Sequence, residues 1–141
     1  MVEVVGLLTT FNGEFNRSAI HGVRRQLLRL QAEAAGLPLI EIPLPWPCSN
    51  EQYESLMDTA LDNARTQLHM DAMAFGDLYL EDIRSYRETT MQGTGLQVMF
   101  PLWQIPTDQL ARQMIAGGLK AAITCLDPRV MPEHFAGAQF S

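Results

Sequence analysis

The sequence lacks the short motifs by which many nucleotide-binding and metal-dependent enzymes are recognised. Its 141 residues contain no GxxxxGK[ST], no GxGxxG and no HExxH segment, which argues against a standalone kinase or dehydrogenase. Cysteine is also scarce, because only Cys48 and Cys125 are present and they fit no CxxC or Cys/His ligand spacing. The cysteines therefore predict neither a disulfide framework nor a Cys/His metal site.

Basic residues and long apolar runs are scarce as well. Ten Lys and Arg face sixteen Asp and Glu, for a net charge of -6, which argues against a broad nucleic-acid-binding surface. The apolar run around Val4 to Leu8 is far shorter than a membrane span, and no basic-then-apolar leader precedes it. We therefore expect no nucleic-acid or membrane partner and a cytoplasmic protein.

Apolar strand-like segments alternate with amphipathic helices along the chain. This alternation predicts an α/β fold with a doubly wound, mainly parallel sheet. We expect one domain over residues 1–127 and a loosely structured tail over 128–141. The predicted strands are Val2 to Thr10, Leu39 to Leu44, Asp71 to Asp77, Val98 to Trp103 and Ala121 to Cys125. The predicted helices begin after Ser18, after Ser49 with its S-x-x-Q capping box, at Glu81 and at Pro106-Thr107.

A corner between a strand and a charged helix is the first candidate site. Gly76 and Asp77 end a strand, and Glu81, Arg84 and Glu88 follow at i, i+3 and i+7 on one helix face. Ligands of open parallel sheets bind beyond such strand ends, and Asp77 could accept from a ribose hydroxyl or hold a cation. The alternative is an exposed helix face tied by weak ion pairs, with Asp77 as a helix-entry residue.

The sequence gives weaker support to the other candidate site residues. Asn12, Cys48, Asp77 and Cys125 all follow or end predicted strands, so we expect them at one rim of the sheet. His21 reads as a surface or capping residue, Cys48 as a packed residue and Cys125 as part of the core. Trp46 and Trp103 could line a pocket for a planar base, although burial beside prolines explains them equally well.

Five segments of the chain are distinctive: VVGLLTTFN (4–12), LQAEAAGLPL (30–39), AFGDLYLEDIRSYRE (74–88), FPLW (100–103) and AGGLKAAITCLD (116–127). Together they resemble the ATP-binding domain of the diphthine–ammonia ligase family, in the adenine nucleotide alpha hydrolase (ATP pyrophosphatase) superfamily. The resemblance covers nearly the whole chain. At the charged helix, Gly76, Asp77, Arg84 and Glu88 fit the family pattern, whereas Asp82 and Ile83 replace a tyrosine and a glutamine.

The family also has an SGGxDS loop that binds the ATP phosphates, and this chain does not contain it. The first strand here resembles the family's second, as if the chain began one βα unit late. Because the first strand lies in the middle of the family's sheet, we expect its neighbours either to close the gap or to leave unpaired edges. We also expect ATP affinity that is weak or lost.

The resemblance implies an ATP-dependent, AMP-forming carboxylate–ammonia ligase or ATP pyrophosphatase. Its cofactors would be ATP and Mg²⁺, and its acceptor a small-molecule or protein-borne carboxylate. The catalytic residues, on the side of the site that binds the acceptor substrate, would be Asp77, Arg84 and Glu88. The substrate-binding residues would be Gly76, Glu81, Trp103, Asn12 and His21. The alternative is a noncatalytic module that binds a ligand at the same rim or forms homo-oligomers through sheet edges. A nucleotide-binding stress-type protein is a third reading, but no glycine-rich segment near the last helix supports it.

Overall fold

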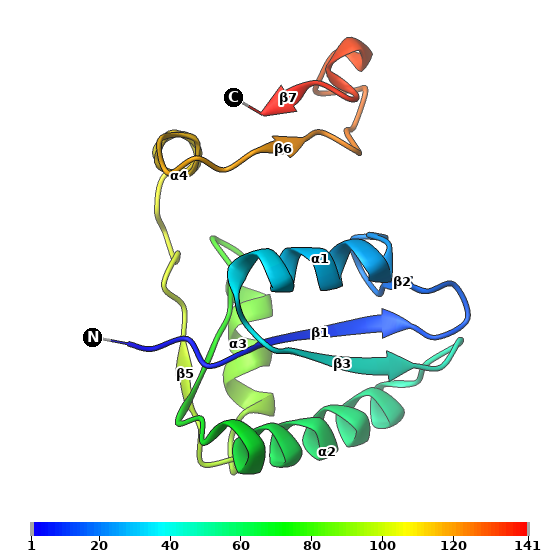
Figure 1. Cartoon of the computed structure of the whole chain (residues 1–141), viewed down its shortest axis with the longest axis vertical. Coiled ribbons are helices and arrows are strands. Elements are labelled where there is room, and N and C mark those ends of the chain that lie inside the picture. Colours follow the sequence, from blue (N-terminus) through cyan, green and yellow to red (C-terminus); the bar gives the residue numbers. More distant parts are fainter. Residues whose placement is uncertain (1, 141) are drawn as a thin grey trace. The chain divides into compact units, whose positions relative to one another are not determined.

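A computed structural model describes residues 2–140 and shows a mixed α/β chain in two compact units. Of the described residues, unit 1 contains 2–75 and 80–99, and unit 2 contains 76–79 and 100–140. Figure 1 labels the elements of both units.

Unit 1 is built around a parallel pair of strands. The first strand runs over Leu7–Asn12 and the third over Leu39–Leu44, and their register pairs Leu7 with Leu39 and Asn12 with Leu44. In Figure 1, α1 lies on one face of this pair and α2 on the other. The elements of unit 1 are β1 (Leu7–Asn12), β2 (Arg17–Ser18), α1 (Arg25–Ala35), β3 (Leu39–Leu44), α2 (Asn50–Leu68), β4 (Ala72–Ala74), α3 (Glu81–Thr90) and β5 (Gln97–Met99).

The strands of unit 1 form two small sheets rather than one continuous sheet. One sheet has the order β2-β1-β3, and a parallel β4-β5 pair forms the other. The coarse α/β prediction is confirmed, but a doubly wound parallel sheet is not, since among the described residues no strand joins β1 to β4. Both sheets reach the same core, in which Leu61, Met91 and Leu96 pack with Leu8, Met70, Met73, Phe75 and Val98.

Ser18 does not cap the first helix, contrary to the prediction. It is buried in the short strand β2, and its Oγ accepts a hydrogen bond from the Val23 N–H. Gly22 then adopts a φ of 63°, a turn conformation that favours glycine, and α1 begins only after Arg24. The first strand is also shorter than predicted, since it begins at Leu7 rather than Val2.

Unit 2 contains one α-helix and a short antiparallel strand pair. The 76–79 segment belongs to it through two hydrogen bonds: the Tyr79 hydroxyl donates to the Ile105 carbonyl at 2.6 Å, and the Gln104 N–H donates to the Leu78 carbonyl at 2.9 Å. The tail expected to be loosely structured contains a 3₁₀ turn and a strand that pairs with β6. The elements of unit 2 are α4 (Thr107–Ala116), β6 (Ala121–Ala122), η1 (Glu133–Phe135) and β7 (Gln139–Phe140).

Candidate functional site

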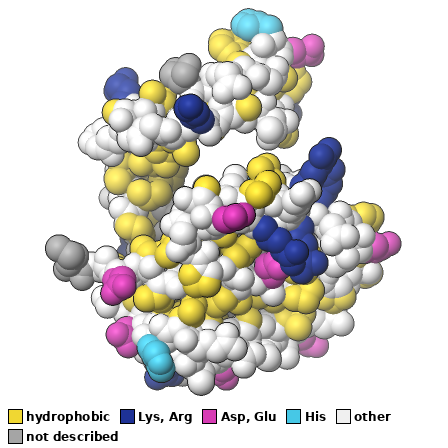
Figure 2. Space-filling view, in the orientation of Figure 1, with side chains coloured by type: hydrophobic (Ala, Val, Ile, Leu, Met, Phe, Trp, Pro, Cys, Tyr) yellow, Lys and Arg dark blue, Asp and Glu magenta, His cyan; other side chains and the backbone are white. Residues whose placement is uncertain are grey.

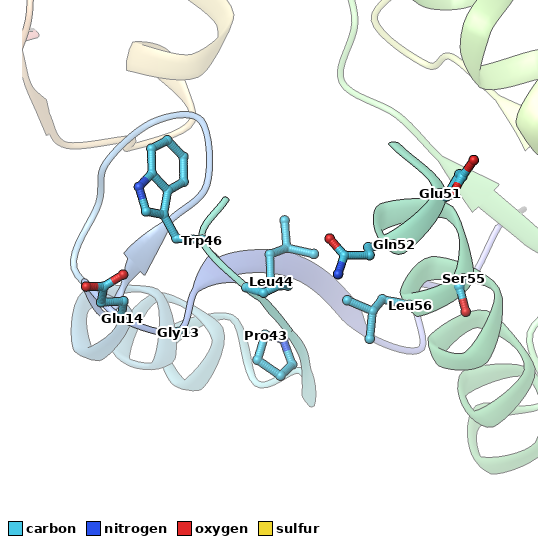
Figure 3. A pocket seen from close by; sticks show the side chains of 10 residues that line it. Gly13, Glu14, Pro43, Leu44, Trp46, Glu51, Gln52, Ser55 and Leu56 are labelled. Atoms are coloured by element: carbon cyan, nitrogen blue, oxygen red, sulfur yellow. The ribbon is translucent and has the colours of Figure 1, made fainter. Parts of the chain in front are cut away.

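A pocket opens at the carboxyl ends of β1 and β3. We call it the strand-end pocket, and its volume is about 810 Å³, within the range of about 300–1,000 Å³ that is typical of small-molecule sites. Figure 3 shows Trp46 and Glu14 on one side and residues of α2 on the other, with Pro43 and Leu44 between them. The lining residues are Gly13, Glu14, Pro43, Leu44, Pro45, Trp46, Glu51, Gln52, Ser55 and Leu56.

The parallel register of β1 and β3 places this pocket. Both strands end at the same level, where Asn12 lies opposite Leu44 and the Gly13 N–H donates to the Leu44 carbonyl at 3.1 Å. The chain then leaves β3 through Pro45 and Trp46 and enters α2 at a complete capping box. In this box the Gln52 N–H donates to the Ser49 Oγ, and the Ser49 N–H donates to the Gln52 Oε1. The capping box therefore fixes the first turn of α2, whose residues line the pocket.

The Asn12 side chain holds the loop that borders the pocket. Its Oδ1 accepts hydrogen bonds from the N–H groups of Glu14 at 2.9 Å and Phe15 at 3.0 Å. The Asn12 carbonyl accepts a further bond from the Asn16 N–H at 2.9 Å. Asn12 was predicted as a substrate-binding residue, and the structure shows it ordering the backbone of the 12–17 loop.

An aromatic pair lies at the edge of the strand-end pocket. The Phe15 and Trp46 rings meet edge to face, with 6.2 Å between their centroids. Trp46 lines the pocket and is 66% exposed, so burial does not account for this residue. An indole face left open to solvent beside a pocket can stack on a planar ligand.

A second concavity, the arginine hollow, is lined by the later residues of the 12–17 loop and by the start of α1. It has a volume of about 480 Å³, and Figure 2 shows basic side chains gathered on this face, over β2 and α1. The 12–17 loop thus serves both concavities, because Gly13 and Glu14 line the first and Phe15 to Arg17 the second. The hollow is lined by Phe15, Asn16, Arg17, Arg24, Arg25, Gln26 and Arg29.

Glu41 holds two of these arginines in place. Its carboxylate accepts from Arg25 Nε at 2.8 Å and from Arg29 Nη2 at 2.6 Å. The hydrogen bonds from Arg25, and then those from Arg29, lower the pKa of Glu41 to about 2. Arg25 also lies over the Phe11 ring, 4.1 Å from its centroid. Glu41 is therefore ionised at neutral pH, and Arg25 is confined between a carboxylate and an aromatic face.

The residues of the predicted charged corner are divided between the two units. Glu81, Arg84 and Glu88 belong to α3 in unit 1, where Arg84 Nε donates to Glu88 Oε1 at 2.9 Å. Gly76 and Asp77 belong to unit 2. A Cβ built on Gly76 would meet no atom within 4 Å. The Arg84–Glu88 ion pair agrees with the alternative of a helix face tied by ion pairs, whereas the assembly of these residues with Asp77 into one site stays a prediction.

The remaining predicted residues belong to different elements of the two units. His21 is exposed in the turn before α1 rather than inside that helix. Trp103 is half-buried in unit 2, where its ring meets that of Phe100 edge to face at 6.0 Å. Cys125, predicted in the core, is exposed just beyond the two-residue strand β6.

Sequence reasoning missed the polar lining of both concavities. In the sequence, Gln52 is recognisable only as a capping residue, and Arg17, Arg24 and Arg29 belong to no motif. The available signal was the concentration of four arginines within residues 17–29, in a chain with only ten basic residues. No group of three His, Cys, Asp or Glu within residues 2–140 is placed to hold a metal ion.

No helix in the described part of the chain is both long and apolar enough to cross a bilayer. The fold and the two concavities are the structural features from which a function can be inferred. Comparisons with protein-family models and with curated protein sequences find no match to this chain.

Proposed function

We propose that this chain is the adenine-nucleotide-binding domain of an ATP-dependent, amide-forming ligase similar to the diphthine–ammonia ligases. In such a reaction a carboxylate oxygen attacks the α-phosphorus of ATP and releases pyrophosphate. Ammonia then attacks the activated acyl carbon, and AMP leaves. The acceptor would be a small-molecule or protein-borne carboxylate, and the protein would act in the cytoplasm.

The strand-end pocket is the observation that carries this proposal. It lies beyond the carboxyl ends of two parallel strands that have a helix on each face, which is where open α/β sheets bind ligands. This local arrangement is also that of a doubly wound sheet, so it supports the finer fold assignment that the resemblance implies.

The lining of the pocket suits a base better than phosphates. Trp46 offers an indole face, and the Gln52 amide nitrogen has donors for the edge of a base, while its Oε1 accepts from Ser49 in the capping box. Glu14 and Glu51, by contrast, would repel phosphate oxygens. A divalent cation that accompanies a nucleotide is usually held by one or two carboxylates together with the phosphates, and this structure assigns no residue to it. The catalytic roles of Asp77, Arg84 and Glu88 rest on the family resemblance.

A Trp103→Phe variant provides the test, because it leaves Trp46 as the sole tryptophan. We expect adenosine and AMP to change the Trp46 emission saturably, whereas ribose 5-phosphate, which lacks the base, does not. Trp46→Phe, which keeps Trp103, is the matched control and should show no saturable change. Unchanged Trp46 emission at millimolar adenosine would overturn the proposed function.

A noncatalytic ligand-binding module is the second candidate. The observation that favours it is that the strand-end pocket contains carboxylates and a hydroxyl but no Lys, Arg or His, so its lining offers no cation to stabilise a departing pyrophosphate. The two candidates differ in turnover. Release of AMP and pyrophosphate from ATP in the presence of ammonia and a carboxylate acceptor supports the ligase, and nucleotide binding without such release supports the module.

A further inference from the structure

The arginine hollow concentrates positive charge in a chain that is acidic overall. Four of the ten basic residues of the chain line it, although the net charge of the whole chain is -6. Glu41 contributes the opposing charge, so four arginines and one carboxylate leave a local charge of +3. Such a hollow attracts anions against the sign of the rest of the protein.

The guanidinium groups are partly held in place and still have donors to offer. The bonds to Glu41 use Nε and Nη2 of Arg25 and of Arg29, which accounts for two of the five N–H donors that each arginine carries. Arg17 is held by a bond from Nη1 to the Gly22 carbonyl at 2.8 Å. Little side-chain freedom would therefore be lost when Arg17 and Arg25 contact an anion.

Two features near the hollow are not neutralised by local acids. Arg24 has no ion-pair partner within residues 2–140. It also precedes the first turn of α1, which has no acidic residue and no side-chain cap. The partial positive charge of the helix N-terminus therefore adds to that of the arginines.

The hollow and the strand-end pocket share the 12–17 loop. Gly13 and Arg17 are four residues apart, so their Cα atoms are separated by at most about 14 Å. Phe15 is a lining residue of the hollow, and its ring contacts the ring of Trp46, a lining residue of the pocket. A ligand that has an aromatic part and an anionic part could therefore occupy both concavities across this aromatic pair.

We propose that the arginine hollow is a phosphate site, which receives the phosphate chain of a nucleotide whose base lies against Trp46. This inference rests on the proposed function for the position of the base. It assigns the phosphates to guanidinium groups rather than to a glycine-rich backbone loop, and Arg forms strong charge-assisted hydrogen bonds with phosphate oxygens.

The test compares adenosine, AMP, ADP, ATP and inorganic tripolyphosphate in calorimetric titrations of the full chain. We expect affinity to rise from adenosine to ATP and tripolyphosphate to bind saturably. In Arg17→Gln/Arg24→Gln, ATP and tripolyphosphate should each bind at least about tenfold more weakly, the loss that corresponds to about one hydrogen bond to a charged group, whereas adenosine affinity should not change. Arg25 and Arg29 are left intact because their removal would leave Glu41 unpaired.

Two control variants separate the site from net charge and from misfolding. Arg112→Gln/Arg129→Gln removes the same charge from exposed positions of unit 2 and should bind every probe like the wild type. Arg17→Lys/Arg24→Lys keeps the charge and should retain part of the tripolyphosphate affinity. Equal tripolyphosphate binding by the wild type and the Arg17→Gln/Arg24→Gln variant would overturn the phosphate site.

The failures of the two proposals are distinguishable. If adenosine changes Trp46 emission but added phosphates do not tighten binding, the phosphate site is wrong and the base pocket stands. If tripolyphosphate binding depends on Arg17 and Arg24 but adenosine does not bind, the proposed nucleotide function is wrong and the hollow binds a different phosphate compound.

Discussion

The Phe15 and Trp46 rings meet edge to face, with the two planes at 67°. The contact brings together a residue of the loop after β1 and a residue of the loop after β3, and it thereby supports one wall of the strand-end pocket. An edge-to-face aromatic pair contributes about 0.5–1.5 kcal/mol beyond the area that it buries. The orientation of Trp46 should therefore depend on Phe15.

The first prediction is that Phe15→Leu weakens AMP binding about two- to tenfold, because Trp46 loses the ring that orients it. Calorimetric titration measures the change. Phe100→Leu is the matched control, since Phe100 supports Trp103 with similar geometry in unit 2. Equal losses in the two variants would mean that Phe15 has no special role at the pocket.

The second prediction concerns the pH dependence of stability. The pKa of Glu41 is about 2 in the folded chain and about 4.3 for an unperturbed glutamate. A lowered pKa stabilises the fold fully above the unfolded value, and this stabilisation is lost as the pH falls through the folded value. We therefore expect the stability difference between wild type and Glu41→Gln to shrink between pH about 4.3 and about 2.

Urea unfolding at a series of pH values measures this difference. Glu33→Gln, on the exposed part of α1, should show no comparable change relative to the wild type. A difference between wild type and Glu41→Gln that stays constant from pH 7 to pH 2 would contradict the assignment of the low pKa to Glu41.

The third prediction is that Ser49→Ala destabilises the fold by about 1 kcal/mol, because it removes the Oγ that accepts from the Gln52 N–H. Ser55→Ala, within the same helix and exposed, should change the free energy of unfolding by less. Chemical denaturation followed by helical circular dichroism compares the two variants. The idea fails if Ser55→Ala is the more damaging substitution.

The fourth prediction tests the shared core of unit 1. Leu61 is 4% exposed and packs with Met91 and Leu96, so Leu61→Ala should cost about 2–5 kcal/mol by leaving a cavity. Leu30→Ala, at a position on α1 that is 52% exposed, should cost much less. If the two substitutions lower the denaturation midpoint equally, the assignment of the core is wrong.

Local signals predicted many of the secondary-structure elements. The strand Leu39–Leu44 was predicted with its observed bounds, and the capping box at Ser49 correctly marked the start of α2. The charged helix from Glu81 and the helix from Thr107 were also located. These elements are defined by side-chain spacing and by caps within a few residues, so one sequence contains the necessary information.

Features that depend on distant parts of the chain were not predictable in this way. Ser18 has the side chain of a cap, but the pairing of β2 with β1 makes its Oγ accept from Val23 instead. The division into two sheets depends on which strands pair with each other. The apolar pattern within one strand does not identify the strand that pairs with it. The sequence indicated that a site would lie at strand ends, but the closeness of Phe15 to Trp46 exists only once β1 and β3 are in register.

Pro43 limits which edge of the β2-β1-β3 sheet could pair with a further strand. The Leu44 carbonyl points toward β1, where it accepts from Gly13, and successive residues of a strand direct their backbone groups to opposite sides. Pro43 therefore faces the outer edge of β3, where it has no N–H to donate. A strand added at the outer edge of β3 would lack the backbone hydrogen bond that Pro43 cannot donate. We therefore expect any strand that extends this sheet to pair with β1 along Leu7–Thr9 instead.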